Sequence, residues 1–416
     1  MALPHVDWFY PGIGLKRWLA LAAAGAVLLV YALLVLAGAL WSDDLLRGLG
    51  WGSFVERPYA VGVLAADGVV LGVVALAVGA RRALRWRRTN PETASEIRAG
   101  TKLARGPRIA AIGGGHGLAA LLSGLKAETS NITAVVTMAD DGGSSGRLRR
   151  EMGLPPPGDI RNCLVALADD ESLMSRLFQY RFADGGLEGH SFGNLFVAAL
   201  AEVTGDFERA VWESTQVLKV RGRVLPATLD DVVLHAQFAD GARVSGQSTI
   251  TTGDRVPRRV WLTPEGPQAL PQAVDAVLHA DMVVLGPGSL YTSVVPNLLI
   301  PAVREAVERT RAWVVYVCNV MTQPGETDGY TAADHLEALY RHGMAGTVDV
   351  VLVNDAPVTG EPARVYERAG SAPVVVDEER LQAMGVRVIR APLAAAADFV
   401  RHDSAALTAA LLRILN

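Results

Sequence analysis

From residue 107 onward, short apolar runs alternate with segments of helical periodicity, and this alternation most limits the folds open to the chain. Runs without polar interruption are typical of strands that are covered on both faces. Strands that alternate with helices predict an α/β fold with a doubly wound, mostly parallel sheet. The predicted strands are Arg108–Ile112, Asn131–Thr137, Met282–Leu285, Trp313–Cys318, Val348–Val353, Val374–Val376 and Val386–Ile389. The predicted helices include Pro271–His279, Val303–Arg311, Ala332–Arg341 and Ala405–Leu415.

One segment breaks this rhythm. The runs Asp231–Phe238 and Ala242–Thr249 flank the dipeptide Asp240-Gly241. Asp-Gly between two strand-like runs is a strong signal for a β-hairpin. We therefore expect a small antiparallel hairpin insertion in the parallel sheet.

The N-terminal part differs from the rest in composition. Residues 18–41 contain no charge, and residues 58–80 contain only Asp67. Because about 20 apolar residues span a bilayer, these stretches predict two transmembrane helices and contact with the membrane. The first run is longer than the apolar core of a signal peptide. Arginines after residue 80 place both termini in the cytoplasm by the positive-inside rule, so the chain is predicted to be a multi-pass protein of the cell membrane.

The expected organisation is a transmembrane hairpin over residues 1–88, a linker over 89–106 and a globular domain over 107–416. The formal net charge of −4 gives no general attraction to nucleic acid. Cys163 and Cys318 form neither a disulfide framework nor a zinc pattern, so both are expected to be buried, reduced thiols.

Two glycine-rich turns follow predicted strands. The first runs from Gly113 to Gly117 and the second from Gly286 to Ser289. Glycines that join a strand to a helix expose backbone amides and the positive end of the helix dipole, which suits a phosphate. The first turn has Leu118 where a dinucleotide fingerprint needs its third glycine, which disfavours NAD. The candidate ligand-binding residues here are Gly114, Gly115, His116, Gly117, Gly286, Gly288 and Ser289.

Acids, hydroxyls and arginines follow the second predicted strand. Asp140 and Asp141 stand at its end, where an acid often binds ribose hydroxyls. The alternatives are a divalent metal such as Mg²⁺ beside the phosphates, or a turn or helix cap. Asp159 is expected to be a helix N-cap. The candidates in this stretch are Asp140, Asp141, Ser144, Ser145, Arg147, Asp159 and Asn162.

Further polar candidates lie in later loops. They are His190, Asn194, Asn319, Thr322, Tyr366 and Arg401. For Tyr366 and Arg401, base stacking and phosphate binding compete with an ordinary surface position. No nucleophile–base–acid triad can be assigned by spacing, so the catalytic residues stay unassigned and a hydrolase is disfavoured. No residue is assigned as a metal ligand.

Several long motifs occur in an order that resembles the CofD/YvcK family, in its YvcK or gluconeogenesis-factor branch. The motifs are Gly113–Leu118, Ala139–Arg149, Pro155–Ala168, Gly189–Leu195, Gly286–Asn297 and Tyr316–Asp328. The resemblance covers residues 107–416 and implies a Rossmann-like fold. It also implies a nucleotide-sugar ligand such as UDP-N-acetylglucosamine, and a role in cell shape and envelope synthesis during gluconeogenic growth. His116 stands where the family usually has Thr, and the N-terminal hairpin is an addition to typical members.

Two functions from different classes fit these observations. The first is a regulator that binds a nucleotide sugar and acts on envelope-synthesis proteins, with a homo-oligomer as an open option. The second is a transferase of the CofD type, which moves a phospholactate group from a guanylated donor to a deazaflavin with Mg²⁺. The feature that would separate them is an acceptor pocket for a flat aromatic ring, which the linear sequence does not reveal.

Overall fold

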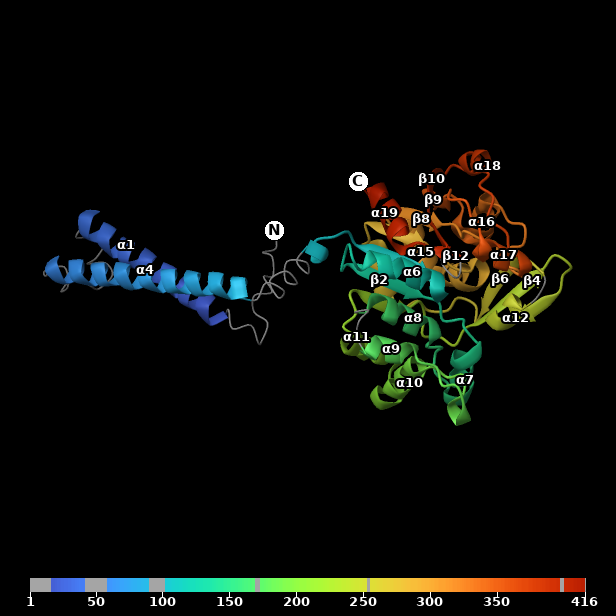
Figure 1. Cartoon of the computed structure of the whole chain (residues 1–416), viewed down its shortest axis with the longest axis horizontal. Coiled ribbons are helices and arrows are strands. Elements are labelled where there is room, and N and C mark those ends of the chain that lie inside the picture. The colour runs from blue at the N-terminus through green and yellow to red at the C-terminus, as the bar shows by residue number, and fades with distance from the viewer. Residues whose placement is uncertain are drawn as a thin grey trace. The chain divides into compact units, whose positions relative to one another are not determined.

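The computed structural model describes residues 16–41, 58–89, 102–168, 173–252, 255–396 and 400–415 (Figure 1). The chain divides into two compact units, Met1–Gly100 and Thr101–Asn416. Most of the predicted linker lies outside the described residues. Its last residues belong to the second unit, because the side-chain amide of Asn131 donates to the carbonyls of Ala104 (3.0 Å) and Gly106 (2.7 Å).

The first unit contains two helices, α1 (Lys16–Trp41) and α4 (Pro58–Thr89). They pack closely where Gly25 meets Gly72. A Cβ atom on Gly25 would lie 2.7 Å from the carbonyl oxygen of Gly72, so only glycine allows the two backbones to approach this closely.

No helix, over those of its residues that the structure describes, is long and apolar enough to cross a membrane. This finding contradicts the two predicted transmembrane helices and the multi-pass localisation in the cell membrane, and we correct both.

The second unit is built on a parallel seven-stranded sheet in the order β10-β9-β8-β7-β1-β2-β3. The described side chains of β1, β2 and β7 are all buried, as the apolar runs predict. The sheet confirms the predicted α/β class. Its strands are β1 (Ile109–Gly113), β2 (Ile132–Val136), β3 (Arg223–Pro226), β7 (Met282–Leu285), β8 (Trp313–Val317), β9 (Val350–Asn354) and β10 (Arg387–Ala391).

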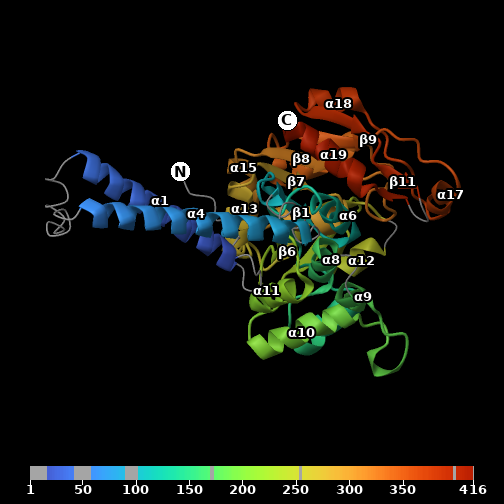
Figure 2. The ribbon, with the colours of Figure 1, turned by 60° about the vertical axis from the view of Figure 1, so that its left-hand side comes forward.

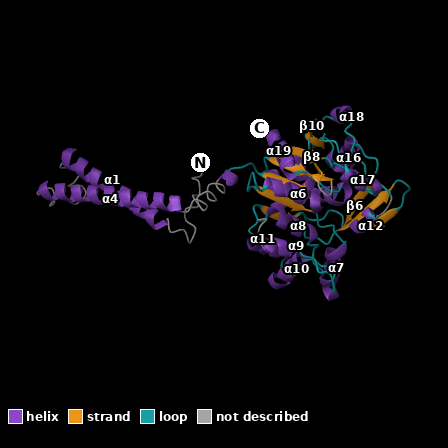
Figure 3. Ribbon diagram, in the orientation of Figure 1, coloured by secondary structure: helices purple, strands orange, loops and turns teal. Residues whose placement is uncertain are grey.

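Helices cover both faces of the sheet (Figure 3). In Figure 2, α13 and α15 lie to one side of the strands and α6 and α19 to the other, and α6 also packs against α8. The helices before the insertion are α6 (Gly115–Leu125), α7 (Gly143–Met152), α8 (Gly158–Leu167), α9 (Leu173–Gln179), α10 (Phe192–Thr204) and α11 (Phe207–Leu218). Those after it are α13 (Pro271–Leu278), α14 (Val295–Leu298), α15 (Pro301–Arg309), α16 (Ala332–Leu339), α17 (Glu361–Arg368), α18 (Glu378–Ala383) and α19 (Ser404–Leu415).

The predicted hairpin forms, but it belongs to a larger insertion. Strand β4 (Val233–Phe238) pairs antiparallel with β5 (Arg243–Ser245) on one edge and with β6 (Pro257–Thr263) on the other. A short helix, α12 (Gln247–Thr251), follows β5 where the prediction extended the strand. A separate small hairpin pairs β11 (Ala394–Ala396) with β12 (Val400–His402).

One predicted strand is wrong. Residues 374–376 form no sheet strand and make only an isolated bridge from Val375 to Thr331. Val375 is 64% exposed, so it lacks the burial that its valine run suggested. Both cysteines are buried and unpaired, as expected.

The strand order places a topological switch point between β1 and β7. From β1 the chain proceeds outward to β2 and β3, whereas from β7 it proceeds the other way to β8, β9 and β10. In open α/β sheets, ligands bind outside the carboxyl ends of the strands at this point. The two glycine-rich turns of the sequence follow β1 and β7.

Candidate functional site

The two glycine-rich turns touch each other at the switch point. A Cβ atom on Gly117 would lie 2.6 Å from the carbonyl oxygen of Pro287 and 3.0 Å from the Cα atom of Gly288. A Cβ atom on Gly288 would lie 3.3 Å from the carbonyl oxygen of Gly114. Gly115 and Gly286 also adopt positive φ angles, of 66° and 79°, which other residues rarely take. Glycine is therefore required here for both contact and conformation.

The N-terminus of α6 opens at this contact. Gly114 is its N-cap and has no side chain to bond the first amides. The backbone amide of Gly115 is bonded by the Asp159 carboxylate, which comes from α8. The remaining first-turn amides and the helix dipole give this end of α6 a partial positive charge, which favours an anionic group.

Asp159 has a different role from the predicted one. Helix α8 begins at Gly158 with Pro157 as its N-cap, so Asp159 lies inside the first turn and is not the N-cap of its own helix. Its carboxylate instead faces the first glycine turn, and a Cβ atom on Gly114 would lie 2.5 Å from its Oδ2. Burial, reinforced by the charge of Asp140, raises the pKa of Asp159 to about 7.

The two adjacent aspartates after β2 face different neighbours. The Oδ1 of Asp140 accepts a 3.0 Å bond from the amide of Gly142, and burial raises its pKa. A Cβ atom on Gly158 would lie 3.0 Å from Asp140 Oδ2, so Asp140 lies beside the start of α8. Asp141 instead accepts a 2.8 Å bond from the amide of Ser248 in α12. Asp140 therefore joins the cluster around the glycine turns, and Asp141 attaches the insertion to it.

These carboxyls show whether the site could bind a divalent metal ion. Within the described ranges, no group of three or more His, Cys, Asp or Glu side chains is placed to hold a metal ion. Asp140 and Asp159 interact electrostatically beside the glycine turns. One or two carboxylates plus ligand phosphates are what Mg²⁺ commonly uses, so these two residues could hold it once a diphosphate is bound.

A second cluster joins α7 to α10. The hydroxyl of Ser144 bonds His190 Nδ1 at 3.0 Å and accepts a 3.1 Å bond from the side-chain amide of Asn194. All three side chains are buried, and burial lowers the pKa of His190. Arg147 extends toward the same segment and donates to the carbonyl of Glu188 at 2.6 Å. These predicted residues thus lie together, although they are far apart in sequence.

Residues after β8 hold the turn after β7 in place. The side-chain amide of Asn319 donates to the carbonyl of Gly288 (3.0 Å), and its Oδ1 accepts from the Gly288 amide (3.3 Å). Ser289 donates to Gln323 at 2.6 Å. Asn319 therefore positions the turn through its backbone.

Sequence reasoning missed Glu326. Its fully buried carboxylate accepts bonds from the backbone amides of Tyr291 (2.6 Å) and Thr292 (3.0 Å). Burial raises its pKa to about 7. The residue lies inside the motif Tyr316–Asp328, but nothing in its local pattern distinguishes it from an exposed loop acid.

The structure does not bring every candidate to the glycine turns. Thr322 bonds the backbone of Ala372, and Tyr366 packs near Val320 and Met321. Asn162 accepts from Arg161 at 2.6 Å. His116 is exposed on α6, and Arg401 lies in β12 with its side chain outside the described part.

Comparison with known proteins gives a consistent result. The family model described as 2-phospho-L-lactate transferase CofD matches residues 109–394. A protein of Bacillus subtilis named gluconeogenesis factor is 52% identical over 313 residues, which is 74% of this chain and 98% of its own. A relative from Nostoc sp. is 45% identical over 421 residues, covering 98% of this chain and 91% of its own, so its alignment extends through the N-terminal unit. A crystal structure of a UPF0052 family member from Bacillus halodurans has a TM-score of 0.72 and 48% identity, and covers 74% of this chain and 99% of that one.

Proposed function

Because this chain belongs to the CofD family and groups with the gluconeogenesis factors, we propose that its second unit binds a nucleotide sugar of the UDP-N-acetylglucosamine type. The observation that carries this proposal is the contact between the Gly113–Gly117 and Gly286–Ser289 turns at the switch point. A diphosphate seated there would meet backbone amides from two strand ends and the N-terminus of α6.

The charge state of Asp140 and Asp159 matters for binding a diphosphate beside the turns. A diphosphate would be repelled by two ionised carboxylates. Asp159, whose pKa is about 7, can remain protonated and donate a hydrogen bond to a phosphate oxygen. Alternatively, Mg²⁺ held by Asp140 and Asp159 would supply the positive charge that offsets the phosphates. Either arrangement makes binding depend on these two residues.

We propose that the biological role of the chain is to regulate envelope synthesis. A protein that binds a precursor sugar nucleotide can report its supply to proteins of envelope synthesis, and so influence cell shape when cells grow on gluconeogenic carbon sources. Its family supports this role, since the Bacillus subtilis relative is named a gluconeogenesis factor.

A transferase of the CofD type is the second candidate. The family model of 2-phospho-L-lactate transferase matches most of the second unit, which favours it. A carboxyl whose pKa is near the working pH, such as Asp159, is also suited to general acid–base catalysis.

Titration calorimetry on the full chain tests both candidates. UDP-N-acetylglucosamine, UDP and GDP are added with and without Mg²⁺, and a guanylated donor is mixed with a deazaflavin acceptor in a parallel sample. All mixtures are followed by phosphorus NMR. The regulator predicts binding of the UDP-sugar without new phosphorus signals, and weaker binding by Asp140→Ala. Product formation from a guanylated donor and a deazaflavin acceptor would support the transferase. Absence of heat with any UDP compound would refute the nucleotide-sugar proposal.

A further inference from the structure

Four exposed arginines line two adjoining clefts on the insertion. Arg243, Arg258 and Arg259 come from β5 and β6, and Arg341 comes from the π-helical turn η4 (Tyr340–Met344). We refer to these four residues as the arginine surface. The clefts have volumes of about 410 and 430 Å³, and both are lined by Gln237 and Arg259, so they are neighbours.

A β-bulge explains why Arg258 and Arg259 both face solvent. Gln237 of β4 pairs with Arg259, whereas the next residue, Phe238, pairs with Pro257. Arg258 is therefore the extra residue of the bulge. On a regular strand, neighbouring side chains point to opposite faces, but a bulge redirects one of them. The bulge therefore places the two arginine side chains next to each other on the exposed face.

Carboxylates do not neutralise this surface. In the part of the chain that the structure describes, none of the four arginines forms an ion pair, whereas the nearby Arg255 pairs with Asp240 at 3.1 Å. Among the described residues, the groups that Arg341 bonds are neutral, namely the hydroxyls of Tyr291 (3.0 Å) and Tyr330 (3.5 Å). Arg243 lies over the ring of Trp261 at 5.8 Å. Glu265 lines the second cleft without pairing with any of the four.

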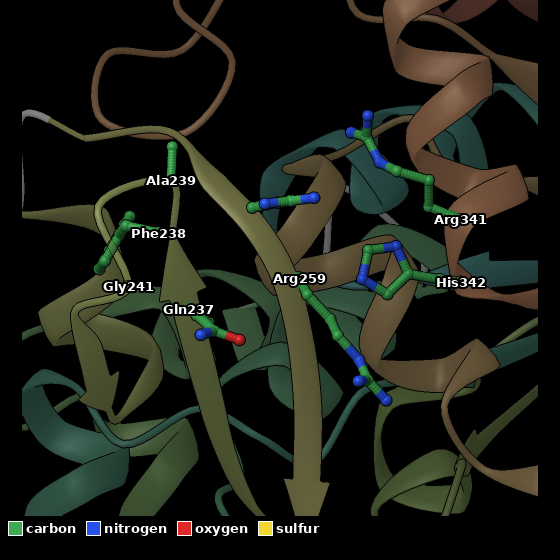
Figure 4. A pocket seen from close by; sticks show the side chains of 8 residues that line it. Gln237, Phe238, Ala239, Gly241, Arg259, Arg341 and His342 are labelled. Atoms are coloured by element: carbon green, nitrogen blue, oxygen red, sulfur yellow. The ribbon is translucent and has the colours of Figure 1, made fainter.

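The cleft wall is fixed in place. His342 Nε2 accepts a 3.1 Å bond from the amide of Val260 in β6, and its Nδ1 bonds the carbonyl of Ala338 at 2.7 Å. The imidazole thus joins η4 to the insertion. Figure 4 shows the side chains of Arg341 and Arg259 extending to different sides of the His342 ring, so the positive charges are spread out and do not converge on one point.

We propose that the arginine surface binds an acidic segment of a partner protein. Spread guanidinium groups match carboxylates along an extended chain, and each can bind a carboxylate through two parallel hydrogen bonds. Arginine and tryptophan are also frequent at the energetic centres of protein interfaces. The formal net charge of −4 disfavours nucleic acid as the occupant. This proposal does not depend on nucleotide binding.

Fluorescence anisotropy on the full chain tests the proposal with two labelled probes of equal charge, an octaglutamate peptide and a thymidine oligonucleotide. We expect the peptide to bind more tightly, and Arg258→Gln/Arg259→Gln to weaken it by about tenfold or more, since each tenfold corresponds to about 1.4 kcal/mol. The matched control is Arg209→Gln/Arg309→Gln, which removes two exposed arginines from α11 and α15. It should change the peptide affinity by less than about twofold on the same scale.

Three results would overturn the proposal: tighter binding of the oligonucleotide, no peptide binding by the unmodified chain, or an equal loss in the control. Because Arg258 and Arg259 are exposed, the variant should keep its circular dichroism spectrum. The nucleotide affinity of the same variant is measured in parallel. Its retention separates a failure at this surface from a failure of the glycine-turn site.

Discussion

At the scale of single residues, the candidate site depends on positions where any side chain is excluded. Gly117 lies within α6 at an ordinary helical φ, yet it has no room for a Cβ atom beside Pro287. The sequence predicted a glycine turn here because glycines clustered after a strand. It could not show that Gly117 needs to be glycine for packing rather than for φ, because the opposing residue is far away in sequence.

Replacing Gly117 by Ala tests this contact. The added methyl group must displace the Pro287 carbonyl, so we expect a loss of about 1–3 kcal/mol in the free energy of unfolding and a large loss of nucleotide-sugar affinity. Denaturant unfolding and calorimetry measure the two effects. Gly186→Ala is the matched control, since nothing lies within 4 Å of a Cβ atom there and its φ is not positive. A Gly117 variant that behaves like the control would contradict the described contact.

Glu326 gives a prediction on pH dependence. Its pKa is about 7 in the folded chain, against 4.5 as the ordinary value. Between these values the folded state keeps a proton that the unfolded state releases, so the free energy of unfolding falls as pH rises through this range. For one such group the fall is on the order of 3 kcal/mol. Glu326→Gln should remove this contribution and flatten the profile.

Urea unfolding at several pH values between 4.5 and 8 measures this effect. Asp159 contributes a slope of the same sign, because its pKa is also raised to about 7. The Glu326 variant should therefore retain part of the dependence. Glu128→Gln, at an exposed position, is the control and should leave the profile unchanged. An unaltered slope in Glu326→Gln would show that this carboxylate is not the source.

At the scale of elements, apolar runs predicted the six strands β1, β2, β7, β8, β9 and β10, which lie in the sheet. The seventh, β3, was missed because it is a short edge strand that begins with an exposed arginine and ends in proline. Strand β6 was missed because Arg258 and Arg259 interrupt its alternation at the bulge. Local pattern therefore predicts the strands with a clear apolar run, including the partly exposed edge strand β10, and fails where tertiary pairing decides.

The same limit applies to the candidate site. The glycine turns and Asp140 were recognisable because residue type alone suits them to a phosphate. The role of Asp159 was not, since proline and glycine before it indicated a cap, and only the packing of α8 against α6 shows the carboxylate facing Gly114. The grouping of Ser144 with His190 and Asn194 likewise arises from the packing of α7 on α10.

That packing gives a prediction for α7. Ser144→Ala removes the partner of two buried polar groups, His190 Nδ1 and Asn194 Nδ2, so we expect a loss of about 1–3 kcal/mol in the free energy of unfolding. Ser214→Ala is the control, because Ser214 is equally buried but bonds only the Ala210 carbonyl of its own helix. Chemical unfolding compares the two. Equal losses would mean that the Ser144 cluster does not hold α7 to α10.

At the scale of the whole molecule, the chain consists of two units, and the candidate site belongs to the second. A ligand that binds only the folded second unit stabilises it by about 2.7 kcal/mol at a concentration of one hundred times its Kd. We expect UDP-N-acetylglucosamine to raise the Tm of the second unit by a few degrees.

Calorimetric scans of the full chain check this expectation, with free N-acetylglucosamine as the control because it lacks the diphosphate. The sugar alone should leave the transition in place. A shift caused equally by the sugar and its nucleotide would show that the diphosphate makes no contribution, and would argue against the glycine turns as its seat.

The close approach of Gly117 to Pro287 and Gly288 also bears on how such proteins can evolve. Neither turn can take a larger residue at these positions unless the backbone of the other turn moves away. Substitutions at 117 and at 287–288 should therefore be inherited together or not at all. Across many related chains, these distant positions would covary as one unit, although 169 residues separate Gly117 from Pro287.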